Sequence, residues 1–447
     1  MSAVMWDRFQ FGFTVTFHYL FPQLTMGLAL IIVLFKWLAL RHGDPKLNDA
    51  ARFFARLFGL NFVMGVVTGI PLEFQFGTNW AGFADRSGGV VGMTLAMEGM
   101  FAFFAESAFL GLFLFGEERL GQRKHLMSAV MVFAGSWLSG YFIVATNAFM
   151  QHPVGYAMMA DGRLRLAHPL IYLFNRWAFW EYAHTMSAAV ITGAFAVSSV
   201  AAWWILSASF PKHGISCLKV VIPLAFAACL LQLFPTGDRQ GKLVARYQPG
   251  ALAGMEGRFK TESNADLIII GQPDPSRRRL ENPIAVPRVL SYLAYGSFGH
   301  KVTGLDDVPG ADQPDNVVLL YYAYHIMVGL GTLFIAIMGA AAWLLLRRRL
   351  ESCQPMLWLL MLAFPFPFIA TTAGWLSAEL GRQPWVVWGV QRTANSASPA
   401  VSSGDAAFTS LGFLGLYSVL FVLFLFLLGR ELRHGPVERA TGREEAQ

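Results

Sequence analysis

The stretch MLWLLMLAFPFPFIATTAGWLSAELGRQPW, residues 356–385, decides the fold. Residues 356–373 carry no charged side chain, and about 20 consecutive apolar residues in a helix are enough to cross the hydrocarbon core of a bilayer. A carboxylate, Glu379, and a guanidinium, Arg382, then follow within one helical turn of each other, before a Pro-Trp pair. Ionisable groups in a membrane helix cost at least ~2.5 kcal/mol near the bilayer centre, so they need a partner or a role.

The rest of the 447-residue chain has the same apolar character. Hydrophobic residues make up 55% of it and charged residues 14%, against about 25% charged in an average soluble domain. The sequence predicts an all-α polytopic membrane protein with nine transmembrane helices packed in bundles. The nine segments lie at about 13–40, 53–76, 91–116, 126–148, 182–207, 216–235, 317–346, 356–378 and 409–429.

The distribution of basic residues predicts the orientation of these helices. With the N-terminus outside, the inner connections and the tail hold sixteen lysines and arginines, and the short outer loops hold six. Basic residues concentrate on the cytoplasmic side of membrane proteins. We therefore expect the N-terminus outside and the C-terminus in the cytoplasm. The net charge of +6 is explained by this topology, and no nucleic-acid partner is expected.

The chain divides into four parts on this basis. Residues 1–235 hold helices one to six, and 236–316 form an extracytoplasmic loop. Residues 317–429 hold helices seven to nine, and 430–447 form a cytoplasmic tail. The loop is too long to be a simple turn, and loops of this length are usually functional or disordered. Its segment ALAGMEGRF is expected to form a short helix.

Eight histidines and glutamates lie within the predicted spans or directly at their ends. With a rise of 1.5 Å per residue, the predicted topology places most of them, together with Met327, at a similar depth in the membrane, near its outer face. Glu98 falls in the outer third of its helix and Glu106 closer to the middle. Histidine and methionine are common axial ligands of haem iron. The eight residues are His18, Glu73, Glu98, Glu106, Glu181, His184, His325 and Glu379.

Each of these residues also has a simpler interpretation. A single membrane histidine often only forms a hydrogen bond between helices, and a single methionine usually fills space. Glu98 and Glu106 could couple protons in a transporter, a class that predicts broken helices near the midplane and repeated halves. A non-catalytic scaffold subunit is a further alternative, although it would not need such costly residues. The common depth favours a haem protein.

Six segments of the chain resemble subunit I of the bd-type quinol oxidases, in the form with a short quinol loop. The resemblance covers nearly the whole length, and the GRQPW motif with its upstream glutamate is its most specific part. The segments are RFQFGFTVTFHYLFPQLTMG (8–27), MEGMFAFFAES (97–107), EYAHTMSAAVITGAF (181–195), MEG (255–257), HIMVGLG (325–331) and AGWLSAELGRQPW (373–385).

The resemblance implies three haems in this subunit: one low-spin haem b, one high-spin haem b, and one haem d or a further haem b in its place. His184 and Met327 resemble the axial pair of the low-spin haem. His18 and Glu379 resemble the axial ligands of the two high-spin haems. The set of residues expected to contact the cofactors also includes Arg382, whose guanidinium suits a haem propionate, as well as Trp375 and His325.

The resemblance also implies the reaction. Quinol is oxidised at the outer loop with Glu256, and O2 is reduced to water at the high-spin haem pair. Protons arrive from the inside past Glu106 and then Glu98, which contributes to the proton motive force without pumping. A second membrane subunit is implied, a small accessory subunit can accompany it, and the expected location is a bacterial inner membrane.

Two positions depart from the family pattern. The family often has a lysine five residues before the loop glutamate, where this chain has Ala251; Arg246 or Arg258 could supply the missing cation. The family usually has an arginine two residues before the methionine ligand, where this chain has His325. Since histidine titrates near 6.5 when unperturbed, we expect a lower or pH-dependent potential for the low-spin haem.

Overall fold

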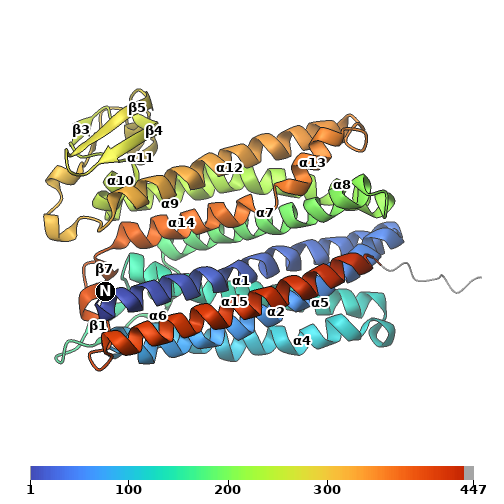
Figure 1. The fold of residues 1–447 in the computed structure, drawn as a ribbon, viewed down its shortest axis with the longest axis horizontal. Helices are drawn as coiled ribbons and strands as arrows, with labels where there is room; N and C mark the ends of the chain where they lie inside the picture. Colours follow the sequence, from blue (N-terminus) through green and yellow to red (C-terminus); the bar gives the residue numbers. More distant parts are fainter. Residues whose placement is uncertain (1, 437–447) are drawn as a thin grey trace, which may run out of the picture.

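The computed structural model describes residues 2–436, without the side chains of 101–103. Long helices lie side by side along one axis (Figure 1). Within the described residues, eight helices are long and apolar enough to cross a membrane, and one bent helix pair makes nine if it is counted as one span. This confirms the predicted all-α membrane fold. Residues 437–447 of the predicted tail lie outside the described residues.

The helices follow the predicted segments and extend beyond most of them. Figure 1 places the N-terminus and the 236–316 loop at one end of the bundle and the end of α15 at the other. This arrangement agrees with the predicted chain path, while the choice of the outer end remains a prediction. The helices are α1 (Ala3–His42), α2 (Pro45–Thr78), α3 (Ala81–Met97), α4 (Phe104–Phe115), α5 (Glu117–Gln151), α6 (Pro169–Leu173), α7 (Arg176–Leu206), α8 (Pro211–Leu231), α9 (Asp238–Tyr247), α10 (Pro249–Met255), α11 (Val289–Tyr295), α12 (Val317–Leu346), α13 (Gln354–Leu362), α14 (Phe366–Arg382) and α15 (Ser403–His434).

Local sequence signals set several helix ends. Gly43 ends α1 in the left-handed conformation, with φ of 65°, which costs glycine little because it has no Cβ. Asp44 then caps α2, whose first residue is Pro45, a position where the missing N–H is not needed. Ser402 and Asp405 form a capping box at the start of α15.

Two crossings contain π-helical turns. Segment η1 (Glu98–Phe103) joins α3 to α4, and η2 (Gln232–Gly237) joins α8 to α9. Because η2 continues the helix, it runs on to Tyr247, past the predicted boundary at residue 235. Such turns occur frequently at functional sites.

The eighth predicted span is bent. Helices α13 and α14 meet at an angle of 41° across a break at residues 363–365. Pro365 lies in the break and Pro367 in the first turn of α14, and a proline removes a backbone donor and disfavours a continuous helix. This break was not expected from the sequence.

The main core lies between α1, α2, α5, α7, α8, α12 and α13. Helices α1 and α7 approach most closely at two glycines. A Cβ on Gly27 would lie 2.0 Å from the carbonyl oxygen of Ala189, and one on Gly193 would lie 2.7 Å from the carbonyl carbon of Gly27. Small residues permit this approach in membrane bundles, and it brings together the helices that carry His18 and His184.

The 236–316 loop is ordered, and the core formed by α9, α10, α11 and short strands also contains buried residues of α5, α7 and α12. The expected short helix within ALAGMEGRF is confirmed as part of α10. Strands β4 and β5 form an antiparallel hairpin that packs against α12. The strands within residues 2–436 are β1 (Tyr156–Met158), β2 (Leu164–Leu166), β3 (Glu262–Ser263), β4 (Leu267–Asp274), β5 (Arg279–Val286), β6 (Lys301–Val302), β7 (Trp385–Val387) and β8 (Gln391–Arg392).

Candidate functional site

Glu379 and Arg382 lie on the last turn of α14 and form an ion pair. Asn147 of α5 donates a hydrogen bond of 2.9 Å to Oε1 of Glu379. The Arg382 side chain is buried, and its Nε and Nη1 groups have no hydrogen-bond partner within the described part of the chain. Glu181 of α7 lies within electrostatic range of both residues. A buried guanidinium with unpaired donors suits an anionic oxygen ligand, because a fixed fork of N–H groups matches a carboxylate.

Trp375 of α14 lies beside α1, whereas His18 of α1 faces α2. The Trp375 ring lies 6.0 Å from the ring of Tyr19, the neighbour of His18. Nδ1 of His18 lies 3.1 Å from the Thr68 hydroxyl oxygen of α2, a bond that fixes the orientation of the ring. A Cβ on Gly69 would lie 2.7 Å from Cε1 of His18, so only glycine leaves room for the imidazole.

His184 faces the π-helical turn η2. Its Nδ1 lies 3.1 Å from the Thr236 hydroxyl oxygen and its Nε2 lies 2.9 Å from the Gln232 amide nitrogen. A hydrogen bond to the second ring nitrogen is the usual way in which a metal-binding histidine is oriented. An iron bond at Nε2 requires the Gln232 side chain to turn away.

Met327 lies on α12 and faces α14. A Cβ on Gly374 would lie 2.8 Å from its sulfur, so this glycine makes room for the thioether next to Trp375. Helix α12 also packs on η2, and α14 packs on α7. The helices that carry His184, Met327 and Glu379 therefore belong to one cluster of elements.

Glu98 is the first residue of the η1 turn, Glu106 lies in the first turn of α4, and both face α5. Ser139 donates a hydrogen bond of 3.1 Å to Oε1 of Glu98, and Ser136 lies beside Glu106. A Cβ on Gly135 would lie 3.1 Å from the backbone nitrogen of Glu106, so α4 and α5 approach closely here. The two carboxylates are within electrostatic range of each other.

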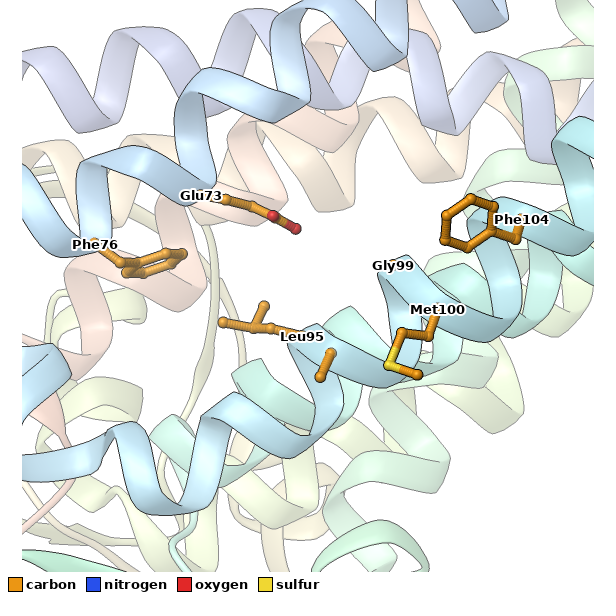
Figure 2. Close-up of a pocket in the computed structure, with 7 residues that line it drawn as sticks. Glu73, Phe76, Leu95, Gly99, Met100 and Phe104 are labelled. Carbon is orange, nitrogen blue, oxygen red and sulfur yellow. The ribbon is translucent and has the colours of Figure 1, made fainter.

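A cavity of about 550 Å³ opens between α2 and the α3–η1–α4 segment. Figure 2 shows Glu73 pointing from α2 into this space, with Leu95, Gly99 and Met100 opposite. Glu73 and Glu98 are within electrostatic range of each other. The structure thus extends the pair of carboxylates to a series of three, in which Glu73 borders the cavity.

Glu256 lies in the loop directly after α10 and is fully buried. Burial raises the pKa of its carboxyl group to about 7, although the nearby positive charge of Arg258 opposes this shift. The Tyr324 hydroxyl and the N–H of Ile268 lie close by. Neither carboxylate oxygen completes a hydrogen bond with a described residue. A buried carboxyl group with a pKa near neutrality can exchange a proton at physiological pH.

The cation beside Glu256 is therefore Arg258, one of the two arginines that the sequence offered. Its Nη1 also forms a 3.0 Å ion pair with Glu262. Arg246 instead lines a separate cavity of about 660 Å³ between α9 and α11, together with Arg239 and Lys242. Ala251 is buried, and a Cβ on Gly381 of α14 would lie 3.2 Å from its Cβ, so α10 and α14 pack closely at this position.

His325 connects α12 to the loop. Its Nδ1 lies 2.9 Å from the carbonyl oxygen of Tyr321 and its Nε2 lies 3.2 Å from that of Ile268 in β4. Its ring lies 3.9 Å from the ring of Tyr321. The contacts of this side chain that the structure describes are therefore with the loop and its own helix.

Sequence reasoning missed the residues that support these groups. Asn147, Ser139, Thr68 and Thr236 are ordinary polar residues in apolar helices, and their positions opposite the candidate residues appear only after folding. Glycines beside candidate residues could have been noted in GWLSAE, but their contacts could not. Across the described residues, no three His, Cys, Asp or Glu side chains converge as a metal site. A haem iron takes only one or two axial protein ligands, so the scattered donors are compatible with haem.

The fold and the site together define a polytopic membrane protein that places imidazole, thioether and carboxyl groups inside its helix bundle. The family model described as cytochrome bd terminal oxidase subunit I matches residues 6–436. The chain belongs to this family, whose members carry haem.

Individual relatives agree with this assignment. The chain is 34% identical to cytochrome bd ubiquinol oxidase subunit 1 of Bacillus subtilis (strain 168), over 97% of this chain and 94% of the relative. It is 28% identical to the putative cytochrome bd menaquinol oxidase subunit I of the same organism, over the full length of both chains. Its structure is similar to that of the bd oxidase from Geobacillus thermodenitrificans, with a TM-score of 0.91 and 32% identity, over 97% of this chain and 99% of the other.

Proposed function

We propose that this chain is the haem-bearing subunit of a respiratory oxidase that oxidises membrane quinol and reduces O2 to water. The observation that supports it best is the extent of the family match, which runs through every element that carries a candidate residue, from His18 to Arg382. The relatives are named as ubiquinol and menaquinol oxidases, so quinol is the common substrate class.

In this proposal three haems, two of type b and one of type d or a further b in its place, supply the electron transfer and the oxygen chemistry when bound. His184 and Met327 would hold the low-spin haem, and His18 and Glu379 would each hold one high-spin haem. Arg382, Trp375 and His325 belong to the surrounding contacts. The glycines that face His18 and Met327 and the unpaired N–H groups of Arg382 support this fit.

The quinol site is proposed at Glu256. Oxidation of a quinol requires an acceptor for its hydroxyl protons, and a carboxylate within hydrogen-bond reach is a suitable general base. The free oxygens of Glu256 can accept such a proton. Arg258 favours the charged form, so that the group can start each cycle as a carboxylate.

Proton delivery is proposed along α3, η1 and α4. Glu106 takes a proton from the cytoplasmic side and passes it to Glu98, with Ser136 and Ser139 as hydrogen-bonding groups between them. Quinol protons leave to the outside, so that each turnover moves charge without a pump. Every charge moved across the potential is worth ~2.3 kcal/mol per 100 mV.

The setting follows from the same proposal. The N-terminus and the loop face the outside of a bacterial inner membrane, and the end of α15 faces the cytoplasm. A second membrane subunit completes the oxidase, and a small accessory subunit can join it. Lipid, quinol and O2 are the remaining partners.

The proton-coupled transporter remains the rival class, and one feature of the structure is shared with it, because the α13–α14 crossing is broken. A reduced-minus-oxidised visible spectrum of the purified complex, with extraction of its haems, separates the two. Bands of haem b, with or without haem d, are expected for the oxidase. A colourless complex would exclude the oxidase.

A further inference from the structure

The β4–β5 hairpin exposes a continuous aliphatic surface. Ile269, Ile270, Ile284 and Val286 expose 47%, 60%, 60% and 43% of their surface. Ile270 pairs with Ile284, and directly paired residues point to the same side of a sheet. Val286 shares this side because it lies two residues from Ile284 in the same strand, and Ile269 is the unpaired residue at the register shift next to Ile270. We call these four residues the aliphatic face. Contiguous apolar patches on a surface usually mark a contact with another protein or with a membrane.

The charged residues of the hairpin lie at the opposite end, around its turn. They pair with one another or with the adjacent loop. The two strands thus divide into an aliphatic half and a charged tip, and Asp266 and Arg288 flank the aliphatic half outside the strands. The charged residues are Asp274, Arg277, Arg278, Arg279 and Glu281.

The depth of the hairpin follows from its contact with α12. The 3.2 Å contact between Nε2 of His325 and the carbonyl oxygen of Ile268 fixes β4 beside this helix. The 30 residues of α12 rise ~45 Å, whereas the hydrocarbon core is about 30 Å thick. If the arginines after Leu346 mark the inner boundary, the core ends about 20 residues earlier, near Met327. Strand β4 therefore lies where hydrocarbon gives way to headgroups.

The aliphatic face lies next to an exposed apolar surface of α12. Leu319, Tyr322 and Ile326 of α12 are exposed on the flank next to His325. Helix α11 packs against β4 and exposes Tyr292, whose ring stacks at 4.8 Å on Phe298. Aromatic side chains of this kind gather at the membrane interface. Figure 1 shows the hairpin beside the end of α12 at the edge of the bundle, away from its centre.

We propose that the aliphatic face inserts into the interfacial layer of the lipid bilayer and anchors the loop to the membrane. The partner is the lipid surface itself, and the charged turn stays in water. Because Ile268 lies beside Glu256, this anchor holds the wall of the Glu256 pocket at the level of the membrane. The inference rests on exposure, depth and continuity with α12, and it does not depend on the role proposed for Glu256.

The test is a pair of spin-labelled variants of the whole oxidase complex in lipid nanodiscs. Cys353 is replaced by serine, because it is the one cysteine that is not buried. A label is then placed at Ile284→Cys on the aliphatic face or at Arg279→Cys on the turn, as a matched control on the same hairpin. Collisions with O2, which concentrates in lipid, are compared with those of a water-soluble nickel chelate. The O2-to-nickel ratio at position 284 is expected to exceed that at 279 several-fold.

Two results would overturn the proposal. Equal ratios at the two positions would place the aliphatic face in water. An immobile label at position 284 that is shielded from both reagents would show that protein, such as the second subunit, covers the face. If the label at 284 disturbs assembly, judged from the visible spectrum, Val286→Cys reports on the same face and has the same expected outcome.

Discussion

Two buried glutamates show how differently one side chain can be used in this molecule. Glu106 lies inside the membrane bundle on α4 and is 6% exposed, and Glu256 lies in the loop and is 0% exposed. Each keeps at least one carboxylate oxygen without a hydrogen-bond partner among the described residues. Burial alone therefore does not distinguish them.

Their neighbours do distinguish them. Glu106 lies beside Ser136 and within range of a second carboxylate, Glu98, so a proton can be passed on. Glu256 lies beside the cation of Arg258 and the phenol of Tyr324, and no second carboxylate among the described residues contributes to its electrostatics. The first arrangement suits a relay and the second suits a terminal base, and the following predictions test this difference.

The largest expected effect is that of Glu106→Gln. Glutamine keeps the size of the side chain but cannot carry a proton, so O2 uptake should fall by roughly 1,000-fold while quinol still reduces the low-spin haem. Steady-state O2 uptake and stopped-flow absorbance measure the two steps separately. Glu351→Gln, at an exposed position between α12 and α13, is the control. Full turnover in Glu106→Gln would show that protons travel elsewhere.

Glu256→Gln should affect the opposite half of the reaction. Without the base, quinol oxidation should fall by about 100-fold, while an artificial one-electron donor still supports O2 uptake because it bypasses the loop. Glu281→Gln in the hairpin turn is the matched control. If Glu256→Gln retains wild-type quinol kinetics, the assignment of the loop site is wrong.

Met327→Leu tests the proposed low-spin haem, which carries electrons from the quinol site at Glu256 to the site of O2 reduction. The substitution removes the sulfur but nearly conserves volume against Gly374, so stability should change by less than about 1.5 kcal/mol. The low-spin haem should become high-spin or be lost. Visible and electron paramagnetic resonance spectra measure this change, and an unchanged low-spin signal would contradict the ligand assignment.

The pH dependence of quinol oxidation should report on Glu256 without any substitution in the membrane helices. Since burial raises the pKa of Glu256 to about 7 from 4.5, the fold favours its protonated form, and this contribution to stability is lost as pH rises through about 7. The base must be ionised to act, so kcat/KM for quinol should rise about tenfold per unit up to pH 7 and then level off. The rise should be absent in Glu256→Gln.

The smallest effect is expected at Arg258. Arg258→Lys keeps the charge that favours ionised Glu256. The rising, acidic part of the pH profile of kcat/KM should therefore shift by less than one pH unit, and one unit corresponds to ~1.4 kcal/mol. Arg258→Met removes the charge and should move this part of the profile to higher pH. A profile that stays in place in both variants would show that Arg258 does not act on Glu256.

The sequence by itself determined the class of fold, because the length and apolar content of a membrane helix are local properties. Residues 317–346, predicted as one span, coincide with α12. The bend between α13 and α14 was missed although Pro365 and Pro367 were visible, since prolines are tolerated in membrane helices and packing decides whether they bend. The sixth span was predicted to end at residue 235, whereas the helix continues through η2 to Tyr247, because a π-helical turn has no clear sequence signal.

The candidate residues were chosen from the sequence by residue type, depth and resemblance, and these properties do not specify contacts. Only the tertiary structure placed Gly374 against Met327, Gly69 against His18, and Arg258 rather than Arg246 beside Glu256. It also gave His325 two carbonyl neighbours, one of them in β4. The physical reason is that depth is set along one helix by hydrophobicity, whereas a contact depends on the rotation and approach of two helices, which are set by packing across the whole bundle.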